Sequence, residues 1–227
     1  MLNDFIALLF PHVCVSCGKS LYKKEHSICT YCAYYLPKTN FHLDSDNPIA
    51  KIFWGRVPLV SAAAFYGFNK GGKVQHLIHQ LKYKGQKYIG FSVGKLYGYE
   101  LKYCEDFNGI DLVIPVPLHP KKQKKRGYNQ SDGFAEGLAE SMNVKADLKT
   151  LYRAVESETQ TKKSRFSRWQ NVESIFQLHN PMALEGKHIL LVDDVITTGA
   201  TLEACAHTLL QVPGVTISIV TIAYAAR

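Results

Sequence analysis

The sequence has no long apolar run. No stretch approaches the ~20 consecutive apolar residues of a membrane-spanning helix. The apolar start of the chain, residues 1–10, is short and contains Asp4 where a secretory signal would carry basic residues. We therefore expect neither a membrane span nor a signal peptide, and we predict a cytoplasmic protein. Internal repeats and low-complexity tracts are missing as well.

Two common nucleotide-binding loops are also missing. The small loop at residues 197–201 has no lysine after its glycine, so it is not a Walker A loop. No G-x-G-x-x-G sequence follows a predicted strand, so the dinucleotide-binding fingerprint is absent. A phosphate site in this chain must therefore use another motif.

Acidic residues are scarce compared with basic ones. The 227 residues include 27 Lys and Arg but only 19 Asp and Glu, which gives a formal charge of +8 and a pI near 9.1. A basic surplus favours polyanionic partners such as polyphosphates, nucleic acid or an anionic membrane surface. The apolar share of 46% is that of an ordinary soluble protein, and the length allows one substantial core with a small appendage.

Four of the six cysteines form two C-x-x-C pairs, separated by the eleven residues 18–28. Each pair places two thiolates on one tight turn, so two pairs can complete a tetrahedral zinc site. Such a site is coordinatively closed, which makes it structural and not catalytic. An iron–sulfur cluster or redox disulfides are the alternatives. The predicted Zn²⁺ ligands are Cys14, Cys17, Cys29 and Cys32.

The most informative stretch spans residues 188–201. Its apolar run, residues 189–192, predicts a strand buried on both faces, of the kind found in parallel α/β sheets. We expect this strand to stop at Asp193 and Asp194. A small loop follows, and apolar residues then recur at helical spacing. The loop consists of Thr197, Thr198, Gly199, Ala200 and Thr201.

This order of elements predicts a binding site for a sugar phosphate. Ligands of open α/β sheets lie beyond the carboxyl ends of the strands, and a helix N-terminus offers free N–H groups to an anion. Carboxylates cannot help to hold a phosphate, but they can accept hydrogen bonds from the neighbouring hydroxyls of a ribose. The alternative is that Asp193 and Asp194 only cap the following helix.

A second buried strand is predicted over residues 111–118, and a basic loop follows it. A helix should then begin near Asn129 or Ser131. Cations at the carboxyl end of a strand repel one another unless an anion or solvent relieves them, and pyrophosphate is one suitable anion. The alternative is a solvated basic loop. The cations are Lys121, Lys122, Lys124, Lys125 and Arg126.

Other predicted elements complete an α/β pattern. A strand is expected over residues 59–66, a helix around residues 74–81 that ends in the basic segment 82–87, a helix over 88–103, and a last strand over 215–223. Residues 37–58 form a mixed polar connection. The polar, basic stretch within residues 151–175 is either disordered or a functional lid. Its cations are Lys162, Lys163, Arg165 and Arg168.

These motifs together resemble one known family. Residues 188–201 closely resemble the phosphoribosyl-pyrophosphate (PRPP) motif of type I phosphoribosyltransferases. With the four cysteines, the sequence Pro-Val-Pro-Leu-His-Pro at 115–120, Arg-Gly-Tyr-Asn-Gln at 126–130 and residues 161–171, the chain resembles the ComF family, the ComFC-type and GntX-like competence proteins. The resemblance implies a zinc-binding module at residues 1–40, a connecting or hood region at 41–110, and a Rossmann-like, parallel-sheet type I phosphoribosyltransferase core at 111–227.

The resemblance also implies roles for the motifs. The acidic pair would hold the ribose hydroxyls of PRPP, the loop would bind its 5′-phosphate, and Mg²⁺ would bridge the hydroxyls and the pyrophosphate. Lys124, Lys125 and Arg126 are the candidates for the leaving pyrophosphate, and the cations of residues 162–168 would belong to a flexible loop that closes over it. Because almost nothing follows the last predicted strand, we expect residues before about 110 to recognise an acceptor that the sequence does not name.

A second hypothesis is a nucleic-acid-binding accessory protein of DNA uptake, which uses PRPP only as a ligand. Its basic loops would follow phosphates, while Tyr128, Phe166 and Trp169 would stack on unpaired bases of single-stranded DNA. A third possibility is that the cysteine module docks a protein partner of the uptake machinery.

Overall fold

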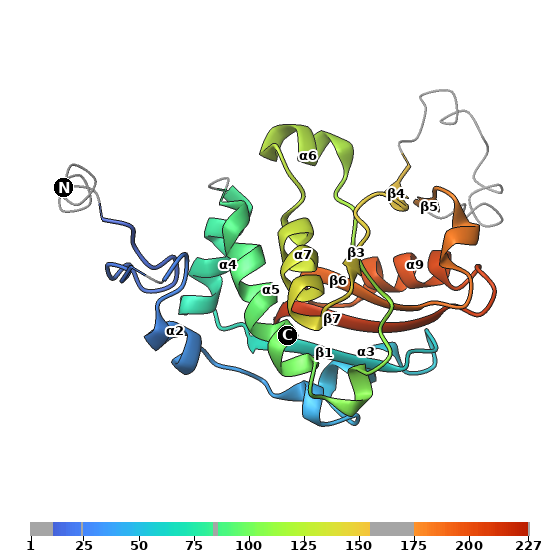
Figure 1. Ribbon diagram of the computed structural model, residues 1–227, viewed down its shortest axis with the longest axis horizontal. Helices are drawn as coiled ribbons and strands as arrows, with labels where there is room; N and C mark the ends of the chain where they lie inside the picture. Colours follow the sequence, from blue (N-terminus) through green and yellow to red (C-terminus); the bar gives the residue numbers. More distant parts are fainter. Residues whose placement is uncertain (1–10, 24, 84–85, 155–174, 227) are drawn as a thin grey trace.

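The computed structural model describes residues 11–23, 25–83, 86–154 and 175–226. Its centre is a five-stranded parallel sheet with the order β1-β7-β6-β2-β3. The strands are β1 (Ser61–Gly67), β2 (Leu112–Pro115), β3 (Lys145–Ala146), β6 (His188–Ile196) and β7 (Thr216–Tyr224). The predicted α/β class with a parallel sheet is confirmed (Figure 1).

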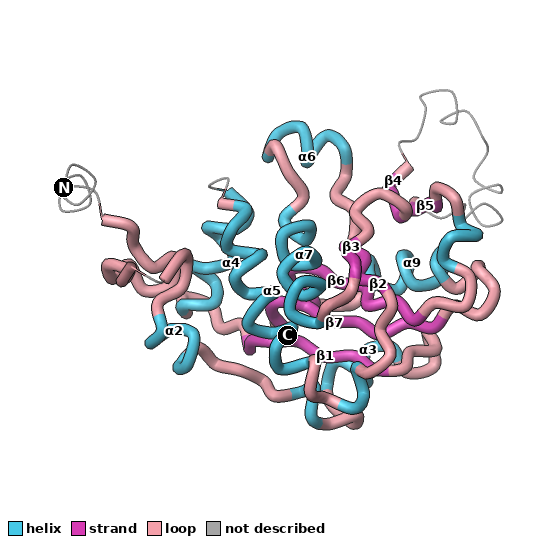
Figure 2. The backbone as a smooth tube through the Cα atoms, viewed as in Figure 1, coloured by secondary structure: helices cyan, strands magenta, loops and turns pink. Residues whose placement is uncertain are grey.

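Helices cover both faces of the sheet, because its strands are apolar on both sides. The helices are α2 (Thr30–Tyr35), α3 (Pro48–Phe53), α4 (Lys73–Tyr83), α5 (Lys87–Leu101), α6 (Pro120–Arg126), α7 (Gln130–Met142) and α9 (Ala200–Leu209). In β6, Leu190 and Val192 pack with α4, α5 and α7, while Ile189 and Leu191 pack with α3 and α9. Figure 2 shows the strands between these two layers.

Shorter elements join these layers. Within the described part of the chain, short 3₁₀-helices lie at Phe41–Leu43, Glu105–Phe107 and Pro181–Leu184. A separate antiparallel hairpin pairs β4 (Leu151–Arg153) with β5 (Phe176–Leu178). Among the described residues, no helix combines the length and the apolar character that a membrane crossing requires.

The polar connection predicted at residues 37–58 contains a helix that the pattern missed. Asn47 caps α3 by accepting hydrogen bonds from the N–H groups of Ile49 and Ala50, and Pro48 occupies the first helical position. Ile49 and Phe53 are buried against the α9 face of the sheet. Part of this connection therefore belongs to the core.

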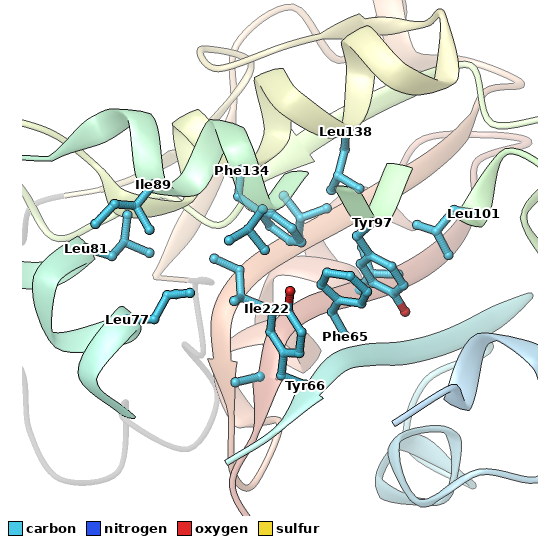
Figure 3. Close-up of a cluster of buried hydrophobic side chains, with 14 of the residues drawn as sticks. Phe65, Tyr66, Leu77, Leu81, Ile89, Tyr97, Leu101, Phe134, Leu138 and Ile222 are labelled. Carbon is cyan, nitrogen blue, oxygen red and sulfur yellow. The ribbon is translucent and has the colours of Figure 1, made fainter. Parts of the chain in front are cut away.

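Aromatic rings fill the core on the other face. Figure 3 shows Phe65, Tyr66 and Tyr97 between the sheet and the helices, with Phe134 and Leu138 of α7 nearby. The rings of Phe65 and Tyr97 are stacked, with their centroids 4.4 Å apart. Cys14, Cys29 and Cys32 belong to the same buried cluster, so the cysteine module packs directly on this part of the core.

Helices α5 and α7 touch backbone to backbone through glycines. A Cβ atom on Gly133 would lie 2.8 Å from the carbonyl oxygen of Lys87, and one on Gly98 would lie 2.9 Å from that of Leu138. A Cβ on Gly94 or on Gly137 would collide with a carbonyl oxygen of the facing helix. This contact holds α7 at a fixed height over the sheet.

Alanine at this contact should destabilise the fold. We expect Gly94→Ala and Gly137→Ala each to lower the free energy of unfolding by about 1–3 kcal/mol, because the helices must separate, although alanine has a helix propensity better by ~1 kcal/mol. Urea denaturation followed by circular dichroism measures the change. Gly67→Ala is the control, since its Cβ would meet nothing nearer than 3.9 Å. Wild-type stability in both helix variants would contradict the prediction.

Candidate functional site

The candidate site lies where the chain leaves two neighbouring strands in opposite directions. From β2 the chain passes through α7 to β3 at one edge of the sheet, whereas from β6 it passes through α9 to β7 on the other side. Such a switch point, at the carboxyl ends of parallel strands, is where open α/β sheets bind ligands. Figure 1 shows α7 and α9 on either side of these strands.

The sequence predicted that the strand would stop at the acidic pair, but β6 continues beyond it. It continues to Ile196, because β7 is long enough to pair with it: Asp193 lies opposite Thr221 and Ile196 opposite Tyr224. Successive side chains of a strand point to opposite faces. Asp194 is therefore buried, at 6% exposure, whereas Asp193 is half-buried.

Side chains from α4 and α7 contact the two carboxylates. Lys82 Nζ lies 3.0 Å from Asp194 Oδ2, and Gln130 Nε2 donates to the same oxygen at 3.3 Å. The hydroxyl of Ser131 donates to Asp193 Oδ1 at 3.0 Å, and the Asp194 N–H donates to this oxygen at 2.8 Å. Both acids are thus already hydrogen-bonded at the switch point.

The helix-capping alternative for the acidic pair is wrong. Helix α9 begins after Gly199, which is its N-cap residue, and Thr198 Oγ1 accepts from the N–H of Ala200 at 3.5 Å. The carboxylates of Asp193 and Asp194 bond instead to α4 and α7. The N–H groups of Thr201 and Leu202, which follow, are left for another acceptor.

Burial raises the pKa of Asp193 to about 7, and the neighbouring Asp194 carboxylate adds to the shift. Hydrogen bonds from the Asp194 N–H and the Ser131 hydroxyl, together with the Lys82 ammonium, oppose it. Two carboxylates side by side cannot both ionise freely. The pair therefore carries less than two negative charges near neutral pH.

This shift predicts a pH dependence of stability. The folded protein keeps a proton on Asp193 that the unfolded chain releases at the ordinary aspartate pKa of 3.8. The unfolding free energy should therefore fall as the pH rises from about 4 to about 7, and level off above. Asp193→Asn keeps an acceptor oxygen but does not titrate. The free energy of unfolding of this variant, relative to that of the wild type, should therefore increase by roughly 1–4 kcal/mol across this pH range. Urea denaturation at several pH values measures the difference, and parallel curves would contradict it.

The loop after β6 lines an open hollow. Its volume is about 250 Å³ when the space open to solvent is included, and Asp193 and residues 195–202 line it. Thr197, Thr198, Ala200 and Thr201 are exposed, while Gly199 is buried. Gly199 has φ +74, and a Cβ there would lie 2.7 Å from Ile52 Cγ2. Glycine is therefore required both by the backbone conformation and by the packing of α3.

The basic segment after β2 is a helix and not the predicted loop. His119 Nδ1 accepts from the N–H of Lys121 at 3.2 Å at its start, and Gly127, with φ +80, ends it. Strand β2 is also shorter than predicted, because Pro117 cannot continue the hydrogen-bond ladder. Figure 1 shows α6 at the end of an arm that projects from the sheet.

The arm exposes Lys121, Lys122, Lys124 and Lys125, whereas Arg126 is half-buried. At its foot, Tyr128 is buried and its hydroxyl donates to the carbonyl of Leu81 in α4. The predicted stacking of Tyr128 on unpaired bases is therefore wrong. The cation that the structure brings to the acidic pair is Lys82. A pyrophosphate role for Lys125 and Arg126 stays a prediction.

The predicted lid cations, Lys162, Lys163, Arg165 and Arg168, lie outside the described residues, as do Phe166 and Trp169. The described flanks of this segment are adjacent. Strand β4 pairs with β5, with Arg153 opposite Phe176, and the Ala154 N–H donates to the carbonyl of Ile175 at 2.9 Å. Both ends of the segment are thus anchored together.

The four predicted zinc ligands converge. The sulfur atoms of Cys14, Cys17, Cys29 and Cys32 all lie within 4.8 Å of one another. The Cys17 and Cys29 sulfurs are 3.7 Å apart, close to the ~3.8 Å edge of a tetrahedron with Zn–S bonds of ~2.3 Å. Burial alone would raise the pKa of the Cys14 thiol, but N–H groups of Cys29, Cys17 and Ser16 lower it to about 7. The four sulfur atoms could therefore coordinate one metal ion as thiolates.

Three residues at the acidic pair were not predicted as site residues. Lys82 lay in a basic segment with no assigned role, and Gln130 and Ser131 lay at an uncertain helix start. The available signal was their position: Gln130 and Ser131 open the helix that follows β2, at the carboxyl end of a strand next to β6. Only the fold brings Lys82 to the same place.

A family model and several curated proteins are similar to this chain. Residues 131–227 match the family model described as a phosphoribosyl transferase domain. The chain is 29% identical over 203 residues to DNA utilization protein YhgH of Escherichia coli K12, covering 88% of this chain and 84% of that protein. It is 25% identical over 205 residues to competence protein ComFC of Bacillus subtilis, covering 88% and 72%.

Competence protein F of Haemophilus influenzae is 31% identical over 130 residues, which covers 56% of this chain and 57% of that protein. Among solved structures, the glutamine PRPP amidotransferase of B. subtilis aligns with a TM-score of 0.40 at 25% identity, over 57% of this chain and 26% of that one. A hypoxanthine phosphoribosyltransferase of Staphylococcus aureus aligns with a TM-score of 0.34 at 18% identity, over 60% of this chain and 62% of that one.

Proposed function

Because this chain belongs to the ComF family of competence-associated proteins, which carry a phosphoribosyltransferase domain, we propose that it binds PRPP with Mg²⁺ and transfers the phosphoribosyl group to a nucleophile. The observation that carries the proposal is the arrangement at the end of β6. Asp193 lines an open hollow that leads to the N-terminus of α9, and Asp194 follows it in β6. A sugar diol and a phosphate need such a pair of sites.

The 5′-phosphate of PRPP would occupy the hollow. Its oxygens would accept hydrogen bonds from the first N–H groups of α9 and from the hydroxyls of Thr197, Thr198 and Thr201, which are exposed there. The buried Gly199 lets the backbone approach without a side chain in the way. Ala200 begins the helix and leaves the hollow open.

The ribose hydroxyls would bind to Asp193 and Asp194. A carboxylate only accepts hydrogen bonds, and a diol offers two donors. The two acids also favour the positive charge that develops on the ribose ring when the bond to pyrophosphate breaks, since this transition state resembles an oxocarbenium ion. When bound, Mg²⁺ would neutralise pyrophosphate charge, and the carboxylate oxygens of the pair are ligands of the kind it prefers.

Cations must then stabilise the leaving pyrophosphate. Our candidates are Lys124, Lys125 and Arg126 of α6, which follows β2, and the basic residues of the predicted lid, which lie between β4 and β5 in the sequence. Closure of such a lid would exclude water, which would otherwise hydrolyse PRPP. Zn²⁺ would hold the cysteine module together without entering the reaction.

The test is a titration of the full chain with PRPP and Mg²⁺ by calorimetry, followed by measurement of pyrophosphate release with nucleobases and with single-stranded DNA as acceptors. We expect saturable binding that depends on Mg²⁺. Binding without pyrophosphate release for any acceptor would support a ligand-binding role alone. No binding of PRPP would contradict the proposal.

The exposed basic arm favours a second candidate function, the binding of single-stranded nucleic acid. Four lysines of one short helix face solvent, and such a charge array binds polyanions in a salt-dependent way. Reversing the charges of Lys121, Lys122, Lys124 and Lys125 should remove this binding, whereas Asp193→Asn with Asp194→Asn should leave it intact. Binding that survives the reversal would exclude the arm as the nucleic-acid site.

A further inference from the structure

Lys82 forms an ion pair with Asp194, the buried acid of the candidate site. It lies in the last turn of α4, and its Nζ is 3.0 Å from Asp194 Oδ2. Its side chain is 25% exposed, whereas that of Asp194 is 9% exposed. A buried carboxylate is costly without a partner. Lys82 therefore supplies the charged partner of Asp194 inside the fold.

The backbone that carries Lys82 is fixed. Leu81, the preceding residue, is fully buried, and its carbonyl accepts a hydrogen bond from the buried hydroxyl of Tyr128. The Nζ of Lys87 lies over the ring of Tyr128, at 5.6 Å from its centroid. The base of the Lys82 side chain is thus held, while its flexible stem allows the ammonium group to move among neighbouring acceptors.

A sugar hydroxyl that binds Asp194 would meet donors that are already in place. Asp194 Oδ2 already receives Gln130 Nε2 and Lys82 Nζ. Gln130 is 5% exposed, and its Oε1 has no hydrogen-bond partner within the described ranges. An unpaired buried acceptor next to an acid suits a ligand with hydroxyl donors. A ribose that binds here would satisfy Gln130 and compete with the Lys82 ammonium.

We propose that Lys82 pairs with Asp194 in the ligand-free protein and moves to the pyrophosphate of PRPP when the ribose takes its place. This inference rests on the proposed function and adds a leaving-group residue to it. In PRPP the pyrophosphate is attached to the carbon next to the 2′-hydroxyl, so it is the nearest anion for a displaced ammonium. At that place a positive charge stabilises the negative charge that grows on the pyrophosphate as the bond breaks.

The two roles of Lys82 predict opposite effects on two ligands. In Lys82→Met, ribose 5-phosphate should bind as well as or better than in the wild type, because the competing ion pair is gone. PRPP should bind more weakly, because its pyrophosphate loses a charged donor. The preference for PRPP over ribose 5-phosphate should fall by about tenfold to hundredfold. Calorimetric titration of the full chain with each ligand and Mg²⁺ measures it.

Lys95→Met is the matched control. It removes the same side chain and an ion pair of similar length, 2.8 Å to Glu140, on the surface between α5 and α7. We expect no change in the preference there. If Lys82→Met does not fold, Lys82→Gln keeps a hydrogen-bond donor for Asp194 but lacks the charge, and the same change in preference is expected.

Three results would overturn the inference. An unchanged preference would show that Lys82 does not reach the pyrophosphate. An equal loss of both ligands in a folded variant would show that Lys82 only supports the acidic pair. Equal affinities of the wild type for ribose 5-phosphate and PRPP would show that the pyrophosphate makes no favourable contact. If the wild type binds neither ligand, the proposed function itself fails.

Discussion

Asp193→Asn with Asp194→Asn is expected to lower the affinity for PRPP by at least about a hundredfold. Each carboxylate would lose a charge-assisted hydrogen bond to a ribose hydroxyl, and such bonds contribute roughly 1.5–3 kcal/mol each. Asparagine has nearly the same shape, so the strand β6 and the hollow beside it should persist. Calorimetric titration with PRPP and Mg²⁺ measures the loss, and the thermal transition confirms that the variant is folded.

A matched control separates this effect from a change of net charge. Asp44 and Asp46 also form a close acidic pair, but they are exposed and lie before α3. Asp44→Asn with Asp46→Asn makes the same two substitutions at exposed positions and should leave the affinity unchanged. PRPP binding of wild-type strength in the Asp193 and Asp194 variant would place the sugar site elsewhere in the chain.

Cys32→Ser is expected to remove the metal ion and to unfold the cysteine module. The purified wild type should contain one zinc ion per chain, and the variant much less than one. Binding of Zn²⁺ to small modules contributes on the order of 10 kcal/mol to their folding. Because Cys14, Cys29 and Cys32 are part of the main buried cluster, the loss should also lower the thermal midpoint of the whole chain. Metal analysis and limited proteolysis measure the two effects.

Cys104→Ser is the control for this prediction. Its thiol is buried but does not belong to the four-cysteine site, and it donates to the carbonyl of His42 at 2.8 Å, a bond that a serine hydroxyl can also make. Zinc content should stay at one. Iron and a visible absorption band in the wild type would instead identify an iron–sulfur cluster, and a metal-free protein with blocked thiols would identify disulfides.

The sheet and the acidic pair were predictable because their signals are local. An unbroken apolar run at residues 189–192 can only be buried on both faces, and the alternate packing of Ile189 and Leu190 on opposite layers confirms it. The end of the strand was not predictable, since it depends on the length of β7. Its partner residues, Thr221 to Tyr224, extend β6 past the acids.

The helices that were missed have caps but no apolar period. Helix α6 has no buried residue, so it has no helical pattern of burial to detect, yet His119, Pro120 and Gly127 mark its ends. Helix α3 was marked in the same way by Asn47 and Pro48. The sequence pattern places both sets of residues in loops. Capping residues would have corrected this where periodicity could not.

The contact of Lys82 with Asp194 could not be predicted from either segment alone. The two residues are 112 positions apart in the sequence. They meet because α4 ends over the carboxyl end of β6. Neither spacing nor composition encodes that meeting. It follows from the packing of α4 on the same face as α5 and α7.

The glycine contact between α5 and α7 determines how accurately the sugar site is built. Gly133 lies one turn after Gln130 and Ser131, and it touches the backbone of α5 at Lys87. Where two main chains meet directly, no rotamer can absorb an error in their spacing. The main-chain contact therefore determines how precisely the side chains of α7 are placed against Asp193 and Asp194. Thermal motion displaces a main chain less than it displaces long side chains.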